Sequence, residues 1–129
     1  MILLDTHIWV WWISNSSQLS RDHRVLLSEL TKSLAVSIIS CWEIAKLVEV
    51  GRLTLDRPVA DWLDTAIRES GVEIIALSPR IVVESTQLPG NFHKDPADQL
   101  IVATARVLGL ELLTADQTIR AYPHVKILG

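Results

Sequence analysis

The chain has 129 residues, of which 49% are hydrophobic and 21% are charged, and its formal net charge is −3. This composition excludes a disordered chain, and the length suits one domain with its own hydrophobic core. The charge shows no basic excess of the kind common in nucleic-acid-binding proteins, although a local basic patch stays compatible with it. The single cysteine excludes an intrachain disulfide and fits a reducing compartment. The N-terminus lacks the basic segment of a signal peptide, and the apolar run at 8–13 is too short to span a bilayer, so we expect a cytoplasmic protein without a membrane segment.

The first predicted strand is the apolar run Met1–Leu4, and the carboxylate of Asp5 follows it directly. A run that is apolar on both faces is typical of a strand buried between helices in a parallel sheet. Ligands of such sheets bind beyond the carboxyl ends of the strands, so Asp5 lies either at the mouth of a site or at the N-cap of the next helix. For the neighbouring His7, a local hydrogen bond is a better interpretation than a ligand role.

The segment Ile8–Ile13 is apolar at all six positions and contains Trp9, Trp11 and Trp12. Six consecutive apolar residues cannot all face one core from a single helix. We therefore expect part of this helix, or the region around Trp42, to pack at an interface with a second protein chain.

Strands and helices alternate along the middle of the chain. Ser20 is a predicted N-cap for a helix with apolar residues on one face. A second buried strand at 34–39 leads into a helix from Cys41 to about Val50, with Ser40 as its N-cap. Further strands are expected at 72–77, 111–114 and 125–128, and further helices at 58–70, 79–88, 96–108 and 117–121.

The most informative stretch is Phe92–Leu100. Asp95 followed by Pro96 predicts a helix start, with Asp95 as N-cap and Pro96 at the first helical position, and Gly109 ends the helix. Asp98 then lies in the first turn, on the face that should point at the sheet. A carboxylate on a buried face is unfavourable unless something positive meets it, and a metal ion would do so. A cap is the alternative role for Asp98, and for Asp95 a cap is the preferred interpretation.

The alternating elements predict a parallel sheet with helices on both faces. Asp5, Glu43 and Asp116 each follow a predicted strand, and Asp98 opens the helix before the fourth strand. If the strand order brings these ends together, the four carboxylates converge, and their mutual repulsion requires divalent cations. Carboxylate oxygens suit Mg²⁺ or Mn²⁺, which can ionise water and stabilise the charge on an attacked phosphate. Two of these acids also have structural alternatives to metal binding. Asp116 could be a helix N-cap, and Glu43 could be stabilised by the positive N-terminal end of its helix, with Lys46 as an exposed partner.

Four segments resemble the PIN domain and, more closely, the VapC-type ribonuclease toxins of toxin–antitoxin pairs. The resemblance covers essentially the whole chain, and its most specific part is His-Lys-Asp-Pro-Ala-Asp. Gln99 stands where the family often has arginine, which affects local charge or substrate contact but not the metal ligands. The four segments are Leu3–Thr6, Trp42–Ile44, His93–Asp98 and Leu113–Asp116.

The resemblance implies one PIN-like nuclease domain over 1–129, folded as a three-layer α/β/α sandwich around a central, mostly parallel five-stranded sheet. It also implies cleavage of RNA with Mg²⁺ or Mn²⁺, a homodimer, and a cognate antitoxin that covers the active site. The residues that match the family's catalytic and metal-binding acids are Asp5, Glu43, Asp98 and Asp116, and those with supporting roles are Asp95, Thr114 and Thr6.

Two other classes of function remain open. One is a phosphatase-like phosphoryl-transfer enzyme on a similar sheet, although Asp5 lacks the second aspartate two residues on that haloacid-dehalogenase-like phosphatases have. The other is a non-catalytic PIN-like binding module, against which the presence of all four acids counts. A metal-dependent assay on RNA and on a phosphomonoester separates the three classes.

Overall fold

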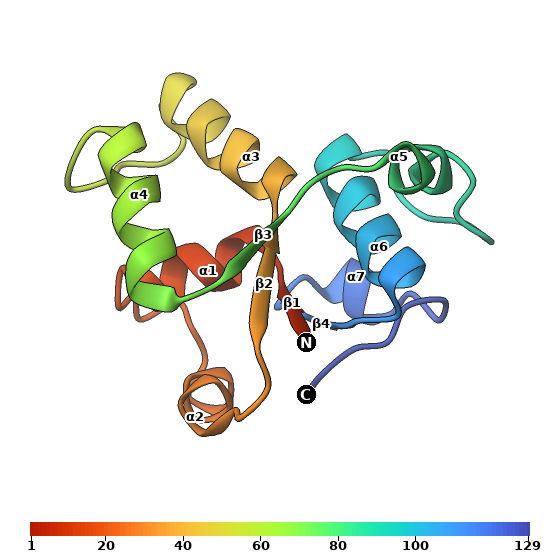
Figure 1. Cartoon of the computed structure of the whole chain (residues 1–129), viewed down its shortest axis with the longest axis horizontal. Helices are drawn as coiled ribbons and strands as arrows, with labels where there is room; N and C mark the ends of the chain where they lie inside the picture. The colour runs from red at the N-terminus through yellow and green to blue at the C-terminus, as the bar shows by residue number, and fades with distance from the viewer.

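The computed structural model describes residues 1–129 and contains one sheet covered by helices (Figure 1). Its four strands are all parallel and lie in the order β3-β2-β1-β4. The strands are β1 (Ile2–Leu4), β2 (Leu34–Ser37), β3 (Glu73–Ile75) and β4 (Glu111–Leu113). The helices are α1 (Thr6–Ile13), α2 (Arg21–Glu29), α3 (Ile38–Glu49), α4 (Val59–Ser70), α5 (Pro79–Ser85), α6 (Pro96–Leu108) and α7 (Gln117–Arg120).

The two faces of the sheet pack into two separate hydrophobic clusters. Successive side chains of a strand point to opposite faces, so Ile2 and Leu4 join one cluster while Leu3 joins the other. The first cluster contains residues of α1, α3 and α4, and the second contains residues of α6 and α7. Figure 1 shows these helices on opposite sides of the sheet. The predicted layers of helix, sheet and helix are therefore confirmed.

The predicted number of five strands is wrong, because the segment at 125–128 is not a strand. It runs beside β4 but forms only one parallel bridge, between Leu112 and Ile127. Backbone groups of a strand alternate between its two edges, and the carbonyl of Leu113 already accepts from Asp5 on the β1 side. Only Leu112 of this three-residue strand therefore offers both its N–H and its C=O to the C-terminal segment.

The boundary between β2 and α3 differs from the prediction by three residues. Ser37, not Ser40, is the N-cap, and its hydroxyl accepts from the N–H of Ile39 at 3.2 Å. Two β-branched residues, Ile38 and Ile39, favour a strand by propensity, but they form the first turn of α3. Consequently Glu43 lies in the second turn of α3, and Ser40 is a buried residue of the helix rather than its cap.

Most of the predicted helix ends are confirmed. Ser20 caps α2 and Asp95 caps α6, with Pro96 at its first position. Gly109 ends α6 with a φ of +66°, a left-handed conformation that glycine adopts without strain. Pro58 is instead the N-cap residue of α4 rather than its first helical residue.

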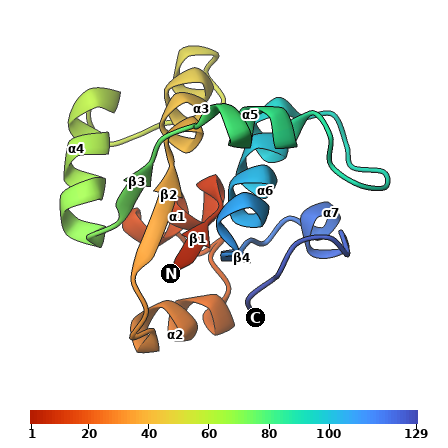
Figure 2. The ribbon, with the colours of Figure 1, turned by 45° about the vertical axis from the view of Figure 1, so that its right-hand side comes forward.

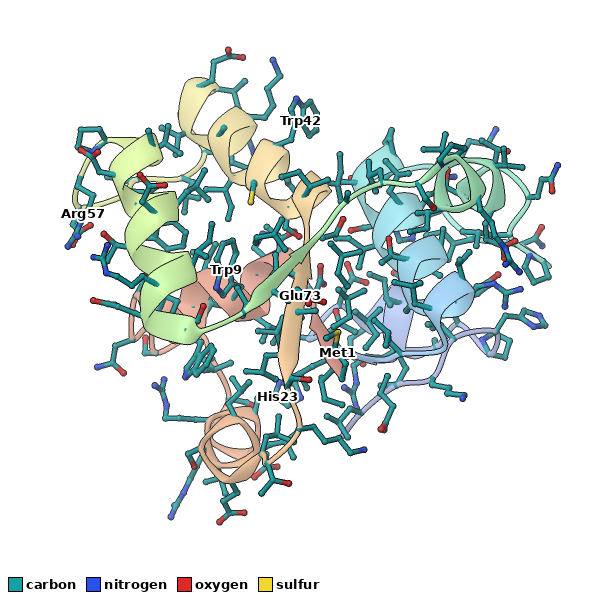
Figure 3. The ribbon with its side chains drawn as sticks, in the orientation of Figure 1. Met1, Trp9, His23, Trp42, Arg57 and Glu73 are labelled. Atoms are coloured by element: carbon teal, nitrogen blue, oxygen red, sulfur yellow. The ribbon has the colours of Figure 1, made fainter.

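The tryptophans of α1 divide between core and surface. Trp9, labelled in Figure 3, is fully buried. Its ring packs against Trp62 of α4 with centroids 5.8 Å apart, and its indole N–H donates to Ser70. Trp11 and Trp12 are only partly buried. No helix of the protein combines the length and apolar content that a membrane crossing needs.

Candidate active site

Asp5 lies at the end of the central strand β1, where β2 and β4 also end. Its Oδ1 accepts from the N–H of Thr6 at 2.8 Å, and its Oδ2 accepts from the hydroxyl of Thr114 at 2.6 Å. The side chain is buried, with the residue 4% exposed, and burial raises the pKa of Asp5 against the opposing effect of these hydrogen bonds. Asp5 therefore both caps α1 and faces the ends of the neighbouring strands, so its two predicted roles coexist.

Glu43 approaches the same end of the sheet from the second turn of α3. Its Oε1 is buried and has no hydrogen-bond partner. Burial raises the pKa of Glu43, and the nearby charge of Asp5 adds to this. The Thr6 hydroxyl gives its hydrogen bond to Ser40 at 2.8 Å, which leaves Glu43 without that donor. A buried carboxylate oxygen without a partner is unfavourable unless a cation meets it.

Two acids come from the start of α6. The Oδ1 of Asp95 accepts from the N–H of Asp98 at 3.0 Å, which is the predicted cap. The Oδ2 of Asp98 lies 2.7 Å from Nε2 of His93. Burial and, after it, the charges of Asp5, Asp95 and Glu43 together raise the pKa of Asp98 to about 6, against the opposing effect of its hydrogen bond with His93. The α6 acids thus share the electrostatic environment of Asp5 and Glu43.

One carboxylate oxygen each from Glu43, Asp95 and Asp98 lies within 4.8 Å of the other two. Hard divalent cations bind oxygen at about 2.0–2.6 Å, so oxygens bound to one ion lie at most about twice that distance apart. The three acids come from α3 and α6, which pack against each other at the same end of the sheet (Figure 2). The grouping therefore includes Asp95, for which only a cap and a supporting role had been expected.

Asp116 lies at the rim of this cluster. It is exposed, and its Oδ1 caps α7 by accepting from the N–H groups of Thr118 and Ile119 at 2.8 and 3.1 Å. Its own N–H donates to the hydroxyl of Thr114, which in turn donates to Asp5. Asp116 is thus linked to Asp5 by hydrogen bonds that share Thr114. Its negative charge also raises the pKa of Asp5, as a smaller contribution than burial.

Three neighbours of the acids differ from what the sequence indicated. The local hydrogen bond expected for His7 is absent, and its exposed ring lies against Trp11 with centroids 5.7 Å apart. Ser40 supports Thr6 instead of capping a helix. His93 is the hydrogen-bond partner of Asp98. The sequence motif includes His93 without indicating this role, although its position five residues before Asp98 is compatible with such a contact.

The residues present fit a hard divalent cation. The donor set consists of carboxylate oxygens, including the unpartnered Oε1 of Glu43. A bound cation would offset the burial and the charge repulsion that together raise the pKa of Asp98. His93 is already paired with Asp98, and the one cysteine, Cys41, is not among the grouped ligand atoms. The set is therefore unlike a zinc site of histidine and cysteine.

The fold and this site define a class of α/β domain with carboxylates gathered at the carboxyl edge of a parallel sheet. The sequence matches the PIN domain family over residues 2–125. It is 36% identical over 123 residues to Ribonuclease VapC22 of Mycobacterium tuberculosis, a match that covers 95% of this chain and 92% of that protein. The chain therefore belongs to the PIN domain family and is of the VapC type within it.

Solved structures share the fold at low sequence identity. VapBC2 from Rickettsia felis, bound to a promoter DNA fragment, has a TM-score of 0.70 and 20% identity, covering 99% of this chain and 98% of that one. A toxin–antitoxin complex from Klebsiella pneumoniae has a TM-score of 0.70 and 22% identity, covering 100% and 97%. FitAcB from Neisseria gonorrhoeae has a TM-score of 0.70 and 20% identity, again covering 100% and 97%. These likenesses extend the fold assignment over the whole chain.

Proposed function

We propose that this protein is a metal-dependent ribonuclease, the toxin of a toxin–antitoxin pair, that hydrolyses phosphodiester bonds of RNA. The observation that carries the proposal is the grouping of Glu43, Asp95 and Asp98 beside Asp5, with one oxygen of Glu43 buried and unpartnered. A purely structural cluster of this kind would repel itself, whereas a hydrolytic site uses it to hold a cation. The ribonuclease name of the 36% identical relative supports the same activity.

In this proposal Asp5, Glu43 and Asp98 would hold Mg²⁺ or Mn²⁺, with Asp95 beside them. Asp116 would complete the site from the rim, directly or through water, because it is exposed and one of its oxygens already caps α7. When bound, the cation would supply an ionised water and stabilise negative charge on the attacked phosphate.

The polar neighbours of the acids act as positioning residues. Thr6 and Thr114 fix the two oxygens of Asp5, so that its carboxylate keeps one orientation. His93 orients Asp98, and the N-terminal end of α6 favours negative charge on this first-turn acid. These contacts hold the donors in place before any ligand arrives, which reduces the reorganisation needed for binding.

The proposal includes a cognate antitoxin protein and a homodimer as partners. The similarity to VapC22 and to solved toxin–antitoxin complexes supports the antitoxin. Exposed apolar side chains on α3 and α5 support a subunit interface, and Figure 3 shows Trp42, 55% exposed, pointing away from the rest of the molecule. Since Trp9 is part of the core, Trp42 is now the better candidate for the predicted interface. The exposed apolar residues of the two helices are Ile38, Trp42, Val82 and Val83.

The test is cleavage of a structured RNA by the purified chain, free of any antitoxin, in Mg²⁺, in Mn²⁺ and in EDTA. We expect cleavage that requires one of the two ions and that falls sharply in Asp98→Asn. A phosphomonoester and a duplex DNA serve as alternative substrates. Hydrolysis of the phosphomonoester without RNA cleavage would favour the phosphatase-like alternative, and no hydrolysis of any substrate by a folded protein would favour the non-catalytic module.

A further inference from the structure

A hollow of about 420 Å³ opens beside the acidic site, and apart from Thr6 its lining has no role in the mechanism above. It is bounded by α1, the loop after α1, the end of α3 and the loop that leads to α4. Its volume is within the range of sites that bind small molecules or single nucleotides. The lining residues used below are Thr6, His7, Trp11, Gln18, Arg52 and Thr54.

The hollow differs in charge from the rest of the chain. None of its eleven lining residues is an aspartate or glutamate, although the chain has 15 of these acids. The guanidinium of Arg52 forms no salt bridge or side-chain hydrogen bond within the protein, unlike Arg57 or Arg106, and Arg52 is exposed. An unpaired guanidinium in a hollow without carboxylates favours an anionic ligand, and phosphate is the anion it fits best.

An aromatic surface completes this lining. Trp11 is half-buried, and its indole ring lies against the exposed ring of His7. Trp11 and Arg52 thus line the same hollow. An aromatic ring and a cationic side chain in one groove are the combination that binds single-stranded nucleic acids, since a base can stack on the ring while the cation contacts the backbone. The polar side chains of Gln18 and Thr54 add hydrogen-bonding groups for a base or ribose.

The hollow and the acids share the first turn of α1. Thr6 lines the hollow, and its N–H donates to Oδ1 of Asp5. His7 also lines the hollow, two residues after Asp5 in the sequence. The hollow and Asp5 are therefore linked directly through Thr6.

We propose that this hollow binds a nucleotide of the RNA substrate next to the cleaved phosphate, with its base stacked on Trp11 and a phosphate bound by Arg52. This inference rests on the proposed ribonuclease function and adds a substrate subsite to it. A protein segment is the other possible class of occupant, but an aromatic ring and an unpaired guanidinium in one hollow without carboxylates match a base and a phosphate, so the lining favours RNA.

The test measures binding of a fluorescently labelled, single-stranded RNA octamer of mixed sequence by anisotropy, on the Asp98→Asn background to prevent cleavage. Trp11→Ala should weaken binding about tenfold, in the range for one base–aromatic stack, while Trp11→Phe should restore most of it. Arg52→Gln should weaken binding several-fold and reduce the slope of log K against log salt by about 0.7, the value for one phosphate contact on a single strand. The matched control is Arg68→Gln, in the last turn of α4 at the amino end of the strands, which should change neither quantity.

The outcomes separate this proposal from the proposed function. Binding that depends on Trp11 and Arg52 in a protein that cleaves no RNA would support the subsite and contradict the nuclease. On the cleaving background, the same variants should raise KM much more than they lower kcat.

Two results would overturn the subsite. One is an equal loss of RNA binding in Arg52→Gln and Arg68→Gln, and the other is unchanged RNA binding in both Trp11→Ala and Arg52→Gln. Normal RNA binding together with lost binding of the co-expressed antitoxin would identify a protein-docking hollow instead. Since Arg52 is exposed, its variant stays informative even if Trp11→Ala is unstable.

Discussion

Replacing Asp98 by asparagine should stabilise the metal-free protein at neutral pH and, at the same time, remove most of the stability that a divalent cation adds. The side chain of Asp98 is only 17% exposed. Burial, followed by the charges of Asp5, Asp95 and Glu43, raises the pKa of Asp98 from 3.8 to about 6. Without a cation, ionised Asp98 therefore destabilises the folded state, and asparagine removes this charge while keeping nearly the same shape.

The size of the effect follows from the pKa. A rise of roughly two pH units at about 1.36 kcal/mol each corresponds to about 3 kcal/mol, an upper value for the gain in Asp98→Asn at pH 7. The pKa is raised in the folded state, so Asp98 destabilises the fold progressively as the pH rises from about 4 to about 6. The advantage of Asp98→Asn should thus be largest at pH 7 and should nearly vanish at about pH 4. A cation at 100 times its Kd would add about 2.7 kcal/mol to the wild type and much less to the variant.

The assay is urea denaturation followed by circular dichroism in EDTA and in Mn²⁺, at pH 7 and at pH 4. Asp64→Asn is the matched control, because Asp64 is exposed on α4 and forms no ion pair, so it should change stability little under every condition. A metal-free Asp98→Asn protein that is less stable than the wild type at pH 7 would refute the electrostatic reasoning. A wild-type protein indifferent to both ions at millimolar concentration would refute the metal site.

The remaining predictions concern the other acids and their supports. Asp5→Asn keeps the helix cap but removes a charge, so we expect a folded protein whose RNA cleavage falls on the order of 100-fold or more, and a double variant with Asp98→Asn should lose little further activity. Asp95→Asn, which retains the cap, should lose much less activity if Asp95 only caps α6, and a loss equal to that of Asp98→Asn would make it a ligand. Thr114→Val should lower the free energy of unfolding by about 2 kcal/mol in urea denaturation, because the buried Oδ2 of Asp5 loses its hydrogen-bond partner, and an unchanged midpoint would contradict this. Trp42→Asp should convert the expected dimer into a monomer in light scattering, and a wild type that is monomeric at all concentrations would exclude this interface.

The sequence alone determined the features that depend on neighbouring residues. Asp95 followed by Pro96 predicted the start of α6, and Gly109 predicted its end, because capping hydrogen bonds and φ preferences act within one turn of the chain. The apolar run before Asp5 likewise predicted a strand buried on both faces, which is confirmed. The prediction from local propensity was wrong at the boundary between β2 and α3. Ile38 and Ile39 have strand propensity, but in the folded protein they begin α3.

Only the tertiary structure decided which acids meet. The order β3-β2-β1-β4 puts β1 between β2 and β4, so Thr114, far along the chain, reaches Asp5. The packing of α3 against α6 groups Glu43 with Asp95 and Asp98 and leaves Asp116 at the rim. Strand pairing and helix packing join residues that are distant in sequence, and their geometry depends on how all the side chains between them fill space, which no short window of sequence contains.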